Sequence, residues 1–109
     1  MDKDIKILVR GIITGYERRK KLYQKQELKS DFDIAVYLAV EQAKNALIVK
    51  YGSEQGALLF DNIFLNTCYR FNYSYSKLNM RGKLYYSKRQ FENIKKKFKQ
   101  EIIDFIGII

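Results

Sequence analysis

The stretch that most constrains the fold is residues 87–105, SKRQFENIKKKFKQEIIDF. Its apolar side chains recur at spacings of three and four residues, the period of a helix that buries one stripe. These positions are Phe91, Ile94, Phe98, Ile102 and Phe105. Ser87 and Gln90 form the S-x-x-Q pattern of a capping box, which places the helix start at Ser87. The stretch therefore predicts one long amphipathic helix whose stripe enters a core.

The face of this helix opposite the apolar stripe is cationic and rich in amides. It carries Arg89, Asn93, Lys96, Lys97 and Gln100, with no carboxylate among them. A face that only keeps a protein soluble normally mixes both signs of charge. Arg, Lys, Asn and Gln pair with phosphates and with base edges in the major groove of DNA. We interpret the face as one that contacts nucleic acid. The alternative is a solvated basic face on a core helix.

Positive charge extends over the whole chain. The sequence has 21 Lys and Arg against 12 Asp and Glu, a formal net charge of +9. Such a charge repels itself unless an anionic partner is near, and nucleic acid is the commonest such partner. An acidic protein or a membrane surface is an alternative. A second basic cluster, residues 18–29, is equally consistent with phosphate contact and with a solvated helix end.

The length and apolar content predict a single folded domain over residues 1–109. The chain is 47% apolar and has no proline, which favours an all-α fold. We expect four to five helices, at about 2–27, 30–50, 53–70, a short one capped by Ser74 or Ser76 and broken at Gly82, and 87–105. Ser30 and Asp33 form a capping box for the second helix, Gly52 ends it, and Ser53 caps the third. A strand pair in the tyrosine-rich segment 71–87 is the alternative.

Two features of packing follow from the same patterns. The predicted core contains Leu38, Ile63, Phe64, Phe91, Ile94 and Phe98, with Cys68 as a small core residue. The first helix contains Gly11 and Gly15, which permit either close packing or a kink. The second helix is apolar on most sides and is predicted to be central.

Several chemistries lack their usual residues. There is no histidine, one cysteine cannot form a zinc site, and there is no phosphate-binding or dinucleotide-binding glycine motif. We therefore expect no enzyme activity, no cofactor and no metal site. The single Cys68 excludes an internal disulfide and fits a reducing compartment. No signal peptide is recognisable, and no apolar run approaches the roughly 20 residues of a membrane span. We expect a cytoplasmic protein with no membrane partner.

From Leu58 onward the layout resembles the helix-turn-helix of sigma-factor region-four domains. It is most similar to the phage late-transcription regulators of the ArpU and RinA type, over about residues 58–105. Tyr75, Ser76 and Leu78 resemble the positioning helix of that motif. Ser87, the Lys88-Arg89-Gln90-Phe91 sequence and the lysines from Lys95 to Lys99 resemble the start of its final helix. Two departures from the family are a longer stretch between Leu78 and Ser87, and Tyr85 where a small residue is usual.

The resemblance implies a regulator from a phage or related mobile element that acts at promoters. The leading hypothesis is therefore a transcriptional regulator that binds double-stranded DNA. The residues predicted to enter the major groove are Arg89, Gln90, Asn93, Lys96 and Lys97, and those predicted to hold phosphates are Lys77, Arg81, Lys83 and Lys88. The alternative is a protein-interaction module that modulates another transcription regulator without binding DNA. The apolar segment 106–109 and the stripe of the first helix also lead us to expect a homodimer.

Overall fold

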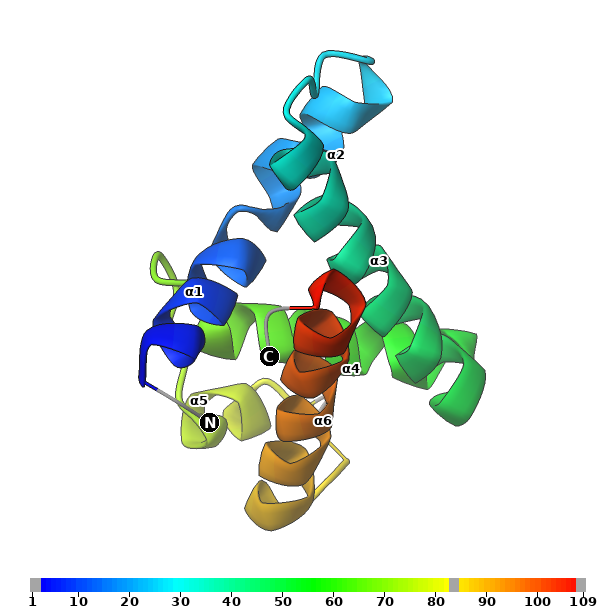
Figure 1. Cartoon of the computed structure of the whole chain (residues 1–109). Helices are drawn as coiled ribbons and strands as arrows, with labels where there is room; N and C mark the ends of the chain where they lie inside the picture. Colours follow the sequence, from blue (N-terminus) through cyan, green and yellow to red (C-terminus); the bar gives the residue numbers. More distant parts are fainter. Residues whose placement is uncertain (1–2, 83–84, 108–109) are drawn as a thin grey trace.

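Helices make up all the secondary structure in residues 3–82 and 85–107, the part of the chain that the computed structural model describes. There are six of them in this part: α1 (Lys3–Thr14), α2 (Tyr16–Gln24), α3 (Asp31–Tyr51), α4 (Ser53–Thr67), α5 (Tyr75–Met80) and α6 (Lys88–Ile106) (Figure 1). The predicted all-α class is confirmed. The strand pair considered for 71–87 is wrong for the described residues of that segment. The helix count exceeds four to five because the predicted first helix is two helices.

The central element is α3, as its apolar sequence predicts. Both α4 and α6 pack extensively against it, and α2 also contacts it (Figure 1). Its buried side chains include two alanines, Ala39 and Ala43, which allow close approach of the neighbouring helices. Leu38 is wrong as a core residue, because it is 37% exposed. A helix that is apolar on most sides does not reveal from sequence which of its apolar residues face outward.

The turn from α3 to α4 is a single glycine. Gly52 has a φ of +92°, a conformation that residues with a Cβ rarely adopt, and it ends α3 as predicted. Gly52 is also the N-cap of α4, so Ser53 is the first helical residue and makes no capping bond. The predicted Ser53 cap is therefore wrong. One turn later, Gly56 lies against α3, where an added Cβ would be 2.6 Å from the Ile48 Cα.

Aromatic and branched side chains fill the space between α4 and α6. The rings of Phe60 and Phe98 meet edge to face with their centroids 5.8 Å apart. Phe91, Ile94, Phe98 and Ile102 are buried, as the stripe predicts, and Ile63, Phe64 and Cys68 join the same cluster. Phe105 is wrong as the last stripe residue: it is 49% exposed, and Ile103 is buried in its place. In the last residues of α6, the buried positions therefore no longer follow the predicted stripe.

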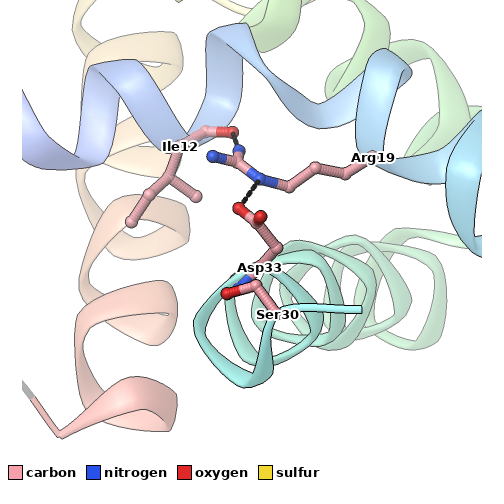
Figure 2. Close-up of polar contacts among 4 residues, drawn as sticks. All are labelled: Ile12, Arg19, Ser30 and Asp33. Carbon is pink, nitrogen blue, oxygen red and sulfur yellow. Dashed lines mark hydrogen bonds and ion pairs between the residues drawn. The ribbon is translucent and has the colours of Figure 1, made fainter. Parts of the chain in front are cut away.

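The predicted first helix, about 2–27, is interrupted at Gly15, and the second segment ends at Gln24. Arg19 explains the interruption (Figure 2). Its Nη1 donates to the Ile12 carbonyl oxygen at 3.2 Å, and its Nε donates to the Asp33 Oδ1 at 3.2 Å. A Cβ at position 15 would lie 2.6 Å from the Arg19 Nη1. Gly15 therefore leaves the space through which Arg19 reaches the end of α1.

The same contact orients the start of α3. The Ser30 side chain accepts a hydrogen bond from the Asp33 backbone N–H, so Ser30 is the N-cap as predicted. The carboxylate of Asp33 accepts from Arg19, which comes from the preceding helix. One cation of the second basic cluster is thereby used for structure.

We expect Arg19→Ala to lower the free energy of unfolding by about 2 kcal/mol, because it removes charged hydrogen bonds from a side chain that is only 12% exposed. Urea unfolding followed by circular dichroism measures the change. Arg18→Ala is the matched control, since Arg18 is exposed and has no partner in the described residues. It should shift stability by no more than about 0.5 kcal/mol. Equal effects of the two variants would contradict the role assigned to Arg19.

Candidate nucleic-acid interface

The start of α6 is fixed by the predicted capping box. The Ser87 Oγ accepts from the Gln90 backbone N–H at 3.2 Å, and the Gln90 Oε1 accepts from the Ser87 N–H at 2.9 Å. This reciprocal pair satisfies two backbone donors that the helix itself leaves free. It also occupies the oxygen of Gln90, one of the residues predicted to read bases. Gln90 therefore acts first as a cap, and only its amide N–H groups remain for a ligand.

The other predicted base-reading residues share one exposed face of α6. Arg89, Asn93, Lys96 and Lys97 are all exposed. Within residues 3–82 and 85–107, none of these four side chains forms a hydrogen bond or ion pair with the rest of the protein. Asn93, Lys96 and Lys97 line one shallow hollow together with Gln100. The structure thus brings together four of the five residues in the predicted set, with their polar groups free.

The basic face has a definite end. The Gln100 Nε2 donates to the Asp104 Oδ1 at 2.9 Å, and Glu101 is exposed beside it. These carboxylates place negative charge on the last turns of α6. The surface suited to a polyanion therefore runs from Lys88 to about Lys97. We define Lys88, Arg89, Asn93, Lys96 and Lys97 as the basic face of α6.

The residues predicted to hold phosphates lie on or near α5 and at the start of α6. The Tyr75 hydroxyl donates to the Tyr86 carbonyl, and the rings of Tyr75 and Phe91 have centroids 6.1 Å apart. These contacts hold α5 beside the start of α6 at the lower end of the view in Figure 1. The described members of the set are all exposed: Lys77, Arg81 and Lys88. Lys83, the remaining member of the set, lies outside the described residues.

Lys77 of α5 and Arg81, the C-cap of α5, both lie near an aromatic ring. The Lys77 Nζ lies 4.0 Å from the centroid of the Tyr73 ring, and the Arg81 Cζ lies 5.8 Å from it. A cation above an aromatic ring gains about 0.5–1 kcal/mol at an exposed site. Lys77 and Arg81 are therefore partly ordered around one ring, on the same end of the molecule as Lys88.

The helix-turn-helix predicted for about 58–105 stays a prediction. The capped short helix α5 is present, with Ser74 as its N-cap and Gly82 after its end at a φ of +75°. It has six residues, and α6 packs mainly along α3. Leu78 of α5 is buried, whereas Met80 is exposed.

The second basic cluster lies at the other end of the molecule. Figure 1 shows α2 at the top of the view and the start of α6 at the bottom. Arg19 is engaged with Asp33, and the Lys20 Nζ lies 6.0 Å from the Tyr16 ring centroid. Arg18 and Lys21 remain exposed. The two clusters therefore do not form one continuous surface.

A polar network without a predicted role links α2 to α3. The hydroxyl of Tyr16 donates to the Glu41 carboxylate. Burial, followed by the hydrogen bond to Glu41, raises the pKa of Tyr16, and burial together with Glu41 raises that of Tyr37. Both phenols are thus protonated at neutral pH, and the stacked rings of Tyr16 and Tyr37 serve packing.

Sequence reasoning missed one cation, Arg10. Its position in the apolar run ILVRGII gave no signal of a role. The structure shows its Nε donating to the Thr67 carbonyl oxygen at 2.8 Å, with its guanidinium 3.9 Å from the Tyr69 ring centroid. The two residues joined by that hydrogen bond are 57 positions apart, so no local pattern could have found it.

Other kinds of site find little support in the described residues. They contain no group of three or more His, Cys, Asp or Glu side chains placed to hold a metal. In the same part of the chain, no helix is both long enough and apolar enough to cross a membrane. Cys68 is buried and free.

Comparison with known proteins gives no further assignment. No protein-family model, no curated protein and no solved structure matches the chain.

Proposed function

We propose that the protein binds double-stranded DNA through the basic face of α6 and acts as a transcriptional regulator. One observation carries this proposal: Arg89, Asn93 and Lys96 are exposed, adjacent on one helix face, and unpaired in the described structure. Three other cations of the described residues pair with a carboxylate: Arg19 with Asp33, Arg70 with Glu17 and Lys95 with Glu92. Polar groups kept free on one face of a helix favour an external anionic partner.

The chemistry of the face suits a duplex. An α-helix fits the major groove, where a forked guanidinium or an amide can pair bidentately with one base edge. Arg89 and Asn93 supply these groups near the start of α6, the part of a recognition helix that contacts bases in helix-turn-helix proteins. Lys88, Lys77 and Arg81 lie at the same end and supply phosphate contacts. Lys97 stands at the edge of the face, close to Lys50 of α3.

The regulatory part of the proposal rests on the resemblance to phage late-transcription regulators. Their helix-turn-helix units act at promoters, and we propose the same for this chain, as a protein of a phage or mobile element. Its one cysteine is unpaired, which supports a reducing compartment such as the cytoplasm. We also propose a homodimer, which would read two half-sites about one helical turn apart. Exposed Ile7 of α1 and Phe105 of α6 offer apolar surface for that contact.

The proposal predicts two classes of variant. Arg89→Ala or Asn93→Ala should cost about 1–3 kcal/mol on the preferred DNA site and relax sequence preference at one position. Lys88→Ala should weaken binding to every sequence alike and lower the salt slope by about one, because a lysine on a phosphate reads only charge. Fluorescence anisotropy on duplex DNA at several salt concentrations, after selection of a preferred site, separates the classes.

The controls are internal to the chain. Lys21→Ala removes an exposed cation from α2, at the far end, and should leave the affinity nearly unchanged at moderate salt. None of the α6 variants should alter the melting temperature by much, because the buried stripe is untouched. If all the α6 variants behave alike on all sequences, the face is a basic patch that does not read bases.

A protein-interaction module is the second candidate. Exposed Met80 and Tyr85 adjoin the start of α6, so apolar side chains border the basic face. A mixed apolar and cationic surface fits an acidic protein, for example another transcription regulator. This candidate replaces the first if the protein binds no duplex at low salt, while a co-purified partner is lost on Arg89→Ala.

A further inference from the structure

A second cationic site lies on the flank of α6 that faces the end of α4. A surface hollow of about 220 Å³ opens there between α1, α6 and the segment after α4. Its lining is polar and comprises Arg10, Asn66, Thr67, Asn72, Lys95 and Lys99. Lys95 and Lys99 follow the stripe residues Ile94 and Phe98 by one position. They therefore point along a different flank from Arg89 and Lys96.

The three cations of the hollow are held in place to different degrees. The hydrogen bond from Arg10 to the Thr67 carbonyl uses its Nε; its terminal Nη groups make no hydrogen bond in the described structure, and the guanidinium lies 3.9 Å from the centroid of the Tyr69 ring. The Lys95 Nζ donates to the Asn66 Oδ1 at 2.8 Å and lies 3.0 Å from the Glu92 Oε2. Lys99 has no hydrogen-bond or ion-pair partner among the described residues. Positive charge in the hollow is thus only partly compensated.

The charges around Lys99 also indicate that positive charge is concentrated in the hollow. Burial, and then the nearby charge of Lys95, lowers the pKa of the Lys99 ammonium, with further lowering by Arg10 and Lys6. Glu92 opposes the shift and is the carboxylate that acts on Lys99. Three like charges around one half-buried ammonium favour the arrival of an anion.

Thr67, which also lines the hollow, carries a buried hydroxyl. Thr67 is 4% exposed, and its Oγ1 has no hydrogen-bond partner. A buried hydroxyl left unpaired costs about 1–3 kcal/mol, so such groups usually have a partner. The end of α4 would repel an anion through its helix dipole, but Arg10 already covers the Thr67 carbonyl there.

We propose that this hollow is a phosphate-binding site. Arg10 and Lys99 supply unpaired charge, Lys95 adds to it, and the Thr67 hydroxyl supplies a neutral donor. A phosphate group fits because it is compact, carries up to two charges, and accepts from several donors at once. The phosphate belongs either to a free phosphate compound or to the backbone of a nucleic acid that also contacts the basic face.

The test uses the full chain without DNA. We expect calorimetric titration with inorganic phosphate, at constant ionic strength set by chloride, to show saturable binding. Lys99→Gln should weaken that binding about tenfold, the loss of one charged hydrogen bond. Lys21→Gln is the matched control: it removes the same charge from an exposed position on α2, at the far end of the molecule, and should leave the affinity for phosphate unchanged.

A second variant keeps the shape of the site. Thr67→Val removes only the hydroxyl, so it should weaken phosphate binding several-fold without lowering the melting temperature of the phosphate-free protein. No saturable heat from the parent, or equal losses for Lys99→Gln and Lys21→Gln, would overturn the site. Neither result depends on whether the protein binds DNA.

A competition experiment then identifies the source of the phosphate. If a nucleic-acid backbone occupies the hollow, phosphate at constant ionic strength should weaken duplex binding by the parent and leave that by Lys99→Gln unaffected. If the ligand is a free phosphate compound, saturating phosphate should leave duplex binding unchanged. Either outcome supports the site. It would be contradicted if phosphate weakened duplex binding by the parent and by Lys99→Gln to the same extent.

Discussion

Gly56→Ala should lower the free energy of unfolding by about 3 kcal/mol, at the upper end of what overpacking costs. The added methyl would lie 2.6 Å from the Ile48 Cα, 2.7 Å from the Ile48 N and 2.8 Å from the Leu47 carbonyl oxygen. All three are backbone atoms, so no side-chain rotation relieves the contact. The two helices must separate, and α3 is also the support of α6. Chemical unfolding of the purified variant measures the loss.

Gly11→Ala is the matched control for this substitution. Gly11 lies inside α1, is exposed, and has no atom within 4 Å of the position where a Cβ would be added. The alanine should therefore stabilise the protein by about 0.5–1 kcal/mol through helix propensity alone. A Gly56→Ala protein as stable as its parent would show that α3 and α4 are further apart than the structure places them.

Phe98→Ala should cost on the order of 3–5 kcal/mol, as the loss of a large buried ring does in other cores. Phe98 is 2% exposed, meets Phe60 edge to face, and lies at the seam of α3 and α6 beside Leu47. A loss of this size approaches the whole stability of a small domain.

Phe105→Ala provides the comparison within the same helix. Phe105 is about half exposed, so its truncation should cost less than about 1 kcal/mol in the monomer. If the proposed homodimer uses Phe105, the variant would instead lose stability in a concentration-dependent way. A Phe98→Ala protein that melts at the same temperature as the parent would contradict the burial of Phe98 in the core.

Local signals predicted α6 well because each acts within a few residues. The Ser87–Gln90 capping box and the three-to-four spacing of Phe91, Ile94 and Phe98 need no knowledge of the rest of the fold. The exposed basic face then follows from helix geometry. Local patterns also assigned two roles to Gln90, one in the cap and one in base reading. In the structure the Gln90 Oε1 accepts a hydrogen bond from the Ser87 N–H, so the oxygen serves the cap.

Features set by tertiary contacts could not be predicted in the same way. The break at Gly15 depends on Arg19 reaching Asp33 in another helix, and a glycine within a helical pattern does not reveal such a contact. In α3, the outward position of Leu38 depends on where α4 and α6 pack. Arg10 lies near Thr67 only because α1 meets the end of α4.

The single-residue link between α3 and α4 also bears on the order in which the chain folds. Contacts across a short loop cost little chain entropy to form. Contacts between α3 and α6 cost more, because the residues of α4 and α5 separate the two helices in the sequence. We therefore expect the α3–α4 hairpin to form early and α6 to dock late. Since α6 carries the basic face, substitutions in its apolar stripe should chiefly accelerate unfolding, and those between α3 and α4 should slow folding.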